Sequence, residues 1–110
     1  MLRLTFSLLL CLLAIDLVAS SVNLGWDPNQ ENNIRGYNIY WGGKSAAYTN
    51  FVFAGNVTNY TLDKLVPGGK YFFVATAIND LTLESDFSNE VSYQVPNKLL
   101  PLTNFRIVSK

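Results

Sequence analysis

Between residues 21 and 95, apolar side chains recur at every second position in short runs that turn residues separate. The clearest run carries Tyr71, Phe73, Ala75 and Ala77 in one phase. A period of two places successive side chains on opposite faces of a strand, and one of those faces can be buried. No helical period interrupts this region. We therefore expect six to seven short strands that build an antiparallel sandwich or barrel.

The remaining strands are expected where apolar residues share the inward phase. They are Val22, Leu24 and Trp26; Tyr37, Ile39 and Trp41; Tyr60, Leu62 and Leu65; and Phe87, Val91, Tyr93 and Val95. A shorter strand is expected over residues 51–53. Most aromatic residues fall in this phase, which predicts that they form the core. Tyr40, Tyr48 and Phe72 are the exceptions.

Residues 1–20 have the features of a secretory signal peptide. Arg3 is the positive charge, an apolar stretch runs from Leu4 to Ile15, and small residues precede the expected cleavage after Ser20. The alternative is an uncleaved membrane anchor, but the stretch is shorter than the ~20 residues that span a bilayer, and Asp16 follows it. We expect a protein that is secreted, periplasmic or on the cell surface, with no membrane association after cleavage.

Composition excludes several classes of function. Lys and Arg balance Asp and Glu at eight each, and the predicted cleavage removes one of each, so the chain lacks the basic surface that nucleic acid requires. There is no histidine, and Cys11, the single cysteine, lies in the signal segment. The usual general base, thiol nucleophile and zinc ligands are therefore missing. We expect no enzymatic activity and no cofactor.

Three runs together resemble a fibronectin type III domain: Leu24-Gly25-Trp26, Gly36-Tyr37-Asn38-Ile39-Tyr40 and Leu65-Val66-Pro67-Gly68-Gly69-Lys70-Tyr71. The resemblance implies an immunoglobulin-like antiparallel β-sandwich over residues 21–96, with Trp26, Tyr37, Leu65, Pro67 and Tyr71 as its structural residues. It also implies a tyrosine corner, in which the Tyr71 hydroxyl bonds a backbone group a few residues upstream.

The chain departs from that family at both ends. Its first strand is expected to be missing or reduced, because only about five residues would precede Trp26 after cleavage, and one sheet edge would then be open. The tail, residues 97–110, resembles the first strand of another repeat. It either begins a second repeat, is a disordered end, or adds a strand to the open edge of its own domain or of another copy.

The resemblance implies a non-catalytic module for protein binding, adhesion or spacing. The alternatives are a carbohydrate-binding or targeting accessory module and a truncated fragment of a longer repeat protein. An outward aromatic cluster around Tyr40 and Phe72 would favour a glycan partner. Exposed Leu81 and Leu83 in the last loop would favour a protein partner, unless these two residues cap the core.

Three further motifs are weaker. Asn56 and Asn59 each begin a glycosylation sequon, which matters only in a eukaryotic host. Asp27, Asn29 and Glu31 alternate as calcium ligands can, but the glycine and distal glutamate of a helix-loop-helix site are missing. A turn that Asp27 initiates is the simpler interpretation. Gly42-Gly43-Lys44-Ser45 lacks the spacing of a phosphate-binding loop and predicts a hairpin turn.

Overall fold

The computed structural model describes residues 20–97 and 101–109. The predicted signal segment lies outside these residues, apart from Ser20 at the start of the first strand. The six strands are β1 (Ser20–Gly25), β2 (Ile34–Gly42), β3 (Asn50–Gly55), β4 (Asn59–Leu65), β5 (Lys70–Asn79) and β6 (Val91–Gln94). Within the described ranges, no helix is long and apolar enough to cross a membrane.

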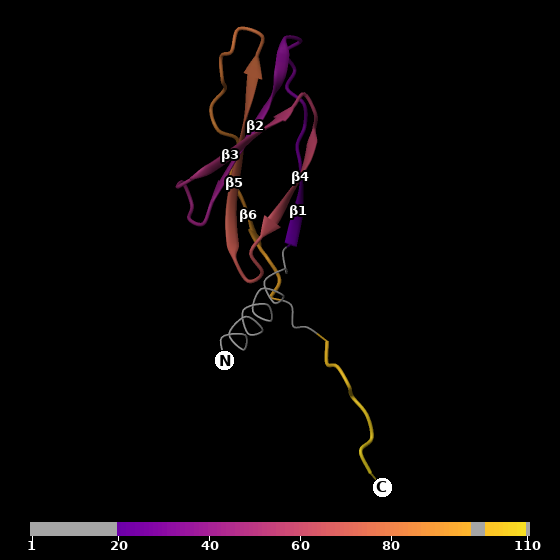
Figure 1. Cartoon of the computed structure of the whole chain (residues 1–110). Coiled ribbons are helices and arrows are strands. Elements are labelled where there is room, and N and C mark those ends of the chain that lie inside the picture. Colours follow the sequence, from indigo (N-terminus) through magenta and orange to yellow (C-terminus); the bar gives the residue numbers. More distant parts are fainter. Residues whose placement is uncertain (1–19, 98–100, 110) are drawn as a thin grey trace, which may run out of the picture.

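The strands form two antiparallel sheets that face each other (Figure 1). One sheet holds β1 and β4, and the other has the order β3-β2-β5-β6. The longest pairing joins β2 to β5, from Ile34 opposite Asn79 to Gly42 opposite Phe72. This arrangement confirms the predicted all-β immunoglobulin-like sandwich. Among the described residues no strand precedes β1, and its outer edge has no strand beside it.

The core lies between the two sheets, where the predicted inward phases meet. Its buried side chains are Ile39, Leu62, Leu65, Phe73 and Val95. The rings of Trp26 and Tyr71 pack against this cluster. Trp26 also contacts Tyr37, with ring centroids 5.6 Å apart. Burial of such rings removes roughly 150–250 Å² each from water, which makes them major contributors to folding.

The corner between β4 and β5 has the geometry that the Leu65–Tyr71 run predicts. The backbone N–H of Val66 donates to the Tyr71 hydroxyl at 3.0 Å, five residues further along the chain. The N–H of Gly69 donates to the Val66 carbonyl at 2.9 Å and closes the turn. Gly68 has a φ of +83°, which a residue without a Cβ adopts at little cost. The predicted tyrosine corner is confirmed.

The last strand differs from its prediction, because β6 spans only Val91–Gln94 and Phe87 lies outside it. Phe87 is 55% exposed rather than part of the core. The Ser85 N–H donates to the Ala77 carbonyl and the Ser88 N–H to the Ala75 carbonyl. The loop therefore advances three residues, from 85 to 88, while β5 advances two, from 77 to 75. The extra residue acts as a bulge and moves Phe87 out of the inward phase.

Candidate functional site

An aromatic patch lies on the outer face of the four-stranded sheet, and it consists of Tyr40, Tyr48, Phe51 and Phe87. Tyr40 stacks on Phe51 with ring centroids 5.6 Å apart. Phe87 meets the rings of Tyr40 and Tyr48 edge-on, at 5.3 and 5.4 Å. Such pairs contribute about 0.5–1.5 kcal/mol each beyond area burial. The patch is therefore a packed surface feature rather than four independent rings.

Two strands and two loops position these rings. Tyr40 of β2 lies directly opposite Phe51 of β3 in the antiparallel register, so both side chains point to the same face. The loop that joins β2 to β3 supplies Tyr48. The loop between β5 and β6 supplies Phe87 and is held along β5 by Ser85 and Ser88, whose hydroxyls each accept a backbone N–H of β5 at 2.9 Å.

Glu84 anchors the patch to the sheet beneath it. Its carboxylate accepts hydrogen bonds from the Thr76 and Tyr40 hydroxyls. The Asn38 side-chain amide donates to the same oxygen at 3.3 Å. These bonds favour the charged form, with that from Thr76 as the largest cause, and hold the pKa of Glu84 below its ordinary value. The same contact with Glu84 raises the pKa of Tyr40.

Glu90 holds the other side of the patch in the same way. It accepts hydrogen bonds from the Tyr48 hydroxyl, from the Ser45 hydroxyl at 2.7 Å and from the Ala46 N–H at 3.1 Å. The bond from Tyr48 is the largest cause that lowers the pKa of Glu90. Glu90 thereby ties the β2–β3 loop to the segment before β6. Both tyrosine hydroxyls of the patch are bound by glutamates.

Phe72 does not join this patch. It lies on the same outer face, opposite Gly42 and two residues before Val74, which pairs with Tyr40, and it is half-buried. The Lys70 ammonium lies over its ring, 5.5 Å from the centroid. An outward aromatic cluster forms around Tyr40, but no ring contact among the described residues joins Phe72 to it.

Leu81 and Leu83 lie at the tip of the turn after β5. They are 72% and 65% exposed, so the alternative that they cap the core is wrong. The Asn79 side-chain oxygen accepts both of their backbone N–H groups, at 3.0 and 2.9 Å, which fixes the turn and leaves the two side chains in solvent. They provide a second apolar feature at one end of the sandwich.

Phe51, Phe53 and Phe87 are exposed, although none of them was predicted to face outward. Phe53 is exposed beside Phe51, with the Arg35 guanidinium 5.8 Å from its ring centroid. The neighbouring Val52 and Ala54 pack on the core, so the period of two within 51–54 could have placed both phenylalanines outside. The alternation of residues did not indicate that Phe87 faces outward, because its orientation depends on the bulge in the loop before β6.

The weaker motifs occupy exposed positions. The Asn56 side-chain amide donates to the Ile34 carbonyl at 3.3 Å, and Asn59 begins β4 opposite Gly25. In the loop after β1, the Asn29 amide donates to Glu31 at 3.1 Å. Across the described residues, no three acidic, cysteine or histidine side chains gather as a metal site would require.

Two facing antiparallel sheets joined through a tyrosine corner define the fold of an immunoglobulin-like binding or spacing module. The chain belongs to the fibronectin type III family, whose model matches residues 12–94 and therefore includes all six strands. Domains of this family are generally non-catalytic and serve in protein interaction or as spacers.

The chain is similar to a small part of two longer proteins and to most of a third, shorter chain. A Kelch domain-containing protein of Saccharolobus solfataricus is 32% identical over 84 residues, and the match covers 76% of this chain but 10% of that protein. The third fibronectin III domain of human KIAA0343 protein has a TM-score of 0.64 and 17% identity over 77% of this chain and 78% of that one. A β-1,2-glucanase from Parabacteroides distasonis has a TM-score of 0.63 and 25% identity, and the match covers 76% of this chain and 11% of the glucanase chain.

Proposed function

We propose that this chain is a secreted, non-catalytic module that binds a protein partner through the aromatic patch. The observation that carries the proposal is the packing of four rings into one surface cluster bordered by Glu84 and Glu90. Phe51 and Phe87 are exposed in this cluster, and Tyr40 and Tyr48 are half-buried. An aromatic centre with a polar rim is the usual composition of a protein–protein contact. Aromatic anchors also contribute most of the binding energy at such contacts.

The geometry of the rings favours a protein over a glycan. The planes of Tyr40 and Phe51 are inclined by 26°, but Phe87 is inclined to Tyr40 by 66° and to Tyr48 by 81°. The four rings therefore do not form one flat platform for a sugar ring. The glutamates already bind both tyrosine hydroxyls, which leaves fewer polar groups for sugar hydroxyls. The exposed Leu81 and Leu83 add apolar surface that suits a protein.

A competition between matched surface variants tests this proposal. The full chain is immobilised as wild type and as the double variant Phe51→Ser/Phe87→Ser, and proteins captured from the extracellular fraction of the source organism are quantified. The double variant Leu81→Ser/Leu83→Ser serves as the control at the other apolar feature. Circular dichroism first establishes that both variants keep the sheet.

Loss of about 2 kcal/mol or more in the binding of one protein is expected for the patch variant, as for an interface anchor. The loop variant is expected to retain that partner. Capture that neither variant reduces would refute the assignment of the patch. Capture lost only in the loop variant would move the contact to Leu81 and Leu83.

The second candidate function is that of an accessory module in a carbohydrate-active protein, and the 25% identity to part of a β-1,2-glucanase supports it. A glycan array probed with the same variants distinguishes the two functions. Binding to a defined glycan that depends on Phe51 and Phe87 would replace the protein proposal. Binding unaffected by both substitutions would not implicate the patch.

Secretion is part of the proposal and rests on the composition of residues 1–20. Expression of the whole sequence in a secreting host, followed by N-terminal sequencing of the exported protein, tests it. The expected first residue is Ser21. Retention in the cell with Met1 intact would contradict secretion.

A further inference from the structure

No strand lies along the outer edge of β1 in residues 20–97 and 101–109. Among the described residues, β1 pairs only with β4, from Ser20 opposite Leu65 to Gly25 opposite Asn59. Val22 and Leu24 point towards the core but remain half-buried. An unpaired edge exposes backbone N–H and C=O groups that can pair with another extended segment.

A cleft of about 340 Å³ opens at the Gly25 end of this edge and reaches into the core. Its lining includes Leu24 of β1 and Trp26 just after β1, and Ile39, Phe73 and Val91 of the other sheet. Val91 lies opposite Phe73 in the register, yet it remains 46% exposed because it faces this opening. The Trp26 indole nitrogen is buried and has no hydrogen-bond partner within the described part of the chain.

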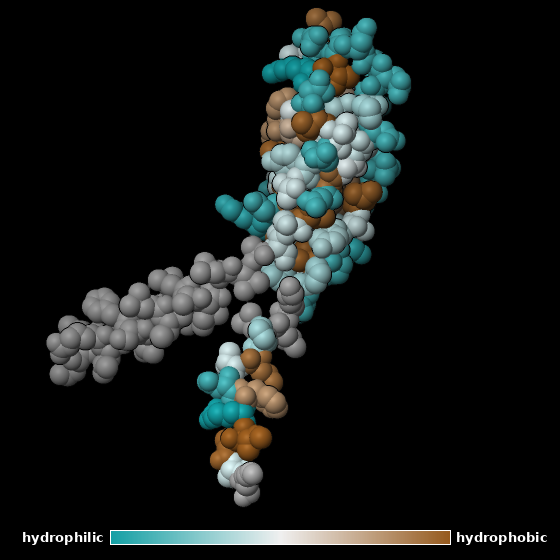
Figure 2. Space-filling view, turned by 90° about the vertical axis from the view of Figure 1, so that its right-hand side faces the viewer, coloured by the Kyte–Doolittle hydropathy of each residue, from teal (hydrophilic) through white to brown (hydrophobic). Residues whose placement is uncertain are grey.

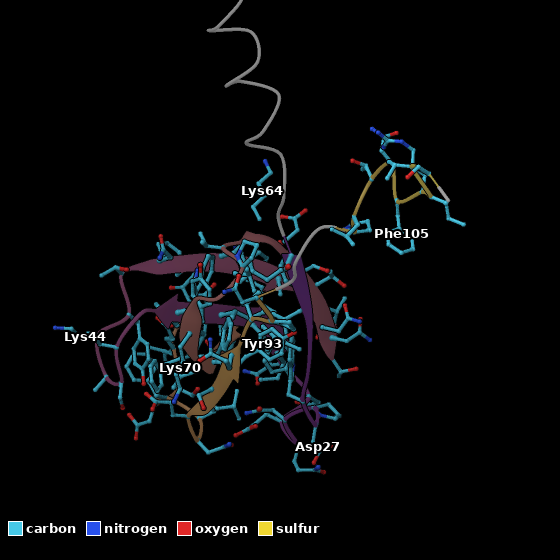
Figure 3. All side chains as sticks on the ribbon, turned by 90° about the horizontal axis from the view of Figure 1, so that it is seen from below. Asp27, Lys44, Lys64, Lys70, Tyr93 and Phe105 are labelled. Atoms are coloured by element: carbon cyan, nitrogen blue, oxygen red, sulfur yellow. The ribbon has the colours of Figure 1, made fainter. Side chains whose placement is uncertain are left out.

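The C-terminal tail carries the pattern that such a cleft and edge would accept. Phe105 and Ile107 are 90% and 84% exposed, and they alternate with Asn104 and Arg106. Figure 2 shows hydrophobic tail side chains in brown outside the sandwich, and Figure 3 shows Phe105 away from both sheets. In an extended segment, Phe105 and Ile107 would point to one face. Neither side chain is buried where the structure places it.

We propose that residues 102–108 of a second copy add an antiparallel strand to the outer edge of β1. Phe105 of the second copy then enters the cleft next to Leu24 and Val91, and Ile107 lies beside the half-buried Val22. The backbone of the added strand satisfies the open edge, and its alternate side chains complete the core, as in other cases of strand addition. The exchange is reciprocal, because each copy offers the same edge and the same tail.

The positions of the chain ends favour a second copy over the chain's own tail. Ser20 lies opposite Leu65 and Gln94 opposite Lys70, so β1 begins and β6 ends at the same corner of the sandwich (Figure 1). Every strand pair in the structure is antiparallel. An antiparallel strand beside β1 must start at Gly25, and the chain's own tail would first have to traverse the length of β1 and turn back.

Two variants that differ only in the tail face they alter test the proposal in the full chain. Phe105→Ser/Ile107→Ser changes the face that enters the cleft, and Asn104→Ser/Arg106→Ser changes the opposite face. Light scattering after size exclusion, over a concentration series, reports the oligomeric state. Hydrogen exchange of the β1 amides reports whether the outer edge is paired.

The wild type and the Asn104→Ser/Arg106→Ser variant are expected to form dimers with protected β1 amides. The Phe105→Ser/Ile107→Ser variant is expected to dimerise about a hundredfold more weakly or not at all, and to lose the protection of the edge. A synthetic peptide of residues 101–110, added to that variant, is expected to restore protection without restoring the dimer.

The remaining outcomes overturn the proposal. A wild-type monomer whose β1 amides exchange freely shows that the tail does not pair. If the wild type is a monomer with protected β1 amides, and Phe105→Ser/Ile107→Ser abolishes that protection, the tail pairs with its own domain. A dimer that survives Phe105→Ser/Ile107→Ser uses another surface, and a tail-dependent dimer without β1 protection docks the tail elsewhere.

Discussion

Gly42 at the end of β2 provides a sharp test of how the aromatic patch is supported. A Cβ at this position would lie 2.1 Å from the Ala47 carbonyl oxygen and 3.2 Å from the Tyr48 Cα. The first distance is far inside van der Waals contact, and the obstacle is backbone rather than a flexible side chain. The substitution Gly42→Ala must therefore displace the loop that carries Tyr48, or bend β2.

We expect Gly42→Ala to destabilise the domain by about 2–3 kcal/mol, at the upper end of the usual overpacking cost. In a domain of this size that corresponds to a fall in Tm of roughly 8 °C or more. Urea unfolding followed by tryptophan fluorescence measures the change. Loss of binding by the patch is expected to accompany it, because Tyr48 packs on Phe87.

The adjacent glycine is the matched control. A Cβ on Gly43 would meet no atom within 4 Å. Gly43→Ala is therefore expected to change stability by no more than about 0.5 kcal/mol, as ordinary surface substitutions do. Equal effects of the two substitutions would refute the reasoning from close contact, and so would a Gly42→Ala protein as stable as the wild type.

Two further predictions concern single hydrogen-bonding groups. Tyr71→Phe is expected to cost about 1 kcal/mol in urea unfolding, because the Val66 N–H loses its partner; Tyr93→Phe, whose ring lies opposite Tyr71, is the control and should cost less. The pKa of Glu84 is lower in the folded protein than in the unfolded chain. Glu84 therefore contributes its full stabilisation at a pH above its pKa in the unfolded chain, and this stabilisation is lost as the pH falls through its pKa in the folded protein. The stability gap between wild type and Glu84→Gln should therefore be larger at pH 7 than at pH 3, and a gap independent of pH would count against the hydrogen bonds of Glu84.

The fold was predictable where local pattern and local chemistry agree. The alternation of Tyr71, Phe73 and Ala77 matches their positions in β5, and Trp26 packs on the core as expected. The tyrosine corner was predictable because its hydrogen bond spans only five residues of sequence. A short loop leaves few ways to place its ends, so the residues themselves specify the contact.

The binding surface was predictable only in part. Tyr40 was expected to face outward and does so, but its neighbours Phe51 and Phe87 were not identified. Phe51 reaches Tyr40 through the register of β2 with β3. Phe87 reaches it because two serines bind β5 with an extra residue between them. The local sequence pattern of these segments predicts neither the register of β2 with β3 nor the bulge between Ser85 and Ser88.

The sequence by itself determined which residues alternate, where the chain turns and which chemistries are missing from its composition. Those properties depend on side-chain type and on neighbours a few positions away. Tertiary structure alone decided that Tyr40, Tyr48, Phe51 and Phe87 meet, and that a cleft opens beside β1. Contacts between residues more than ten positions apart depend on strand pairing, and a shift of one residue in that pairing would turn every side chain of a strand to the opposite face.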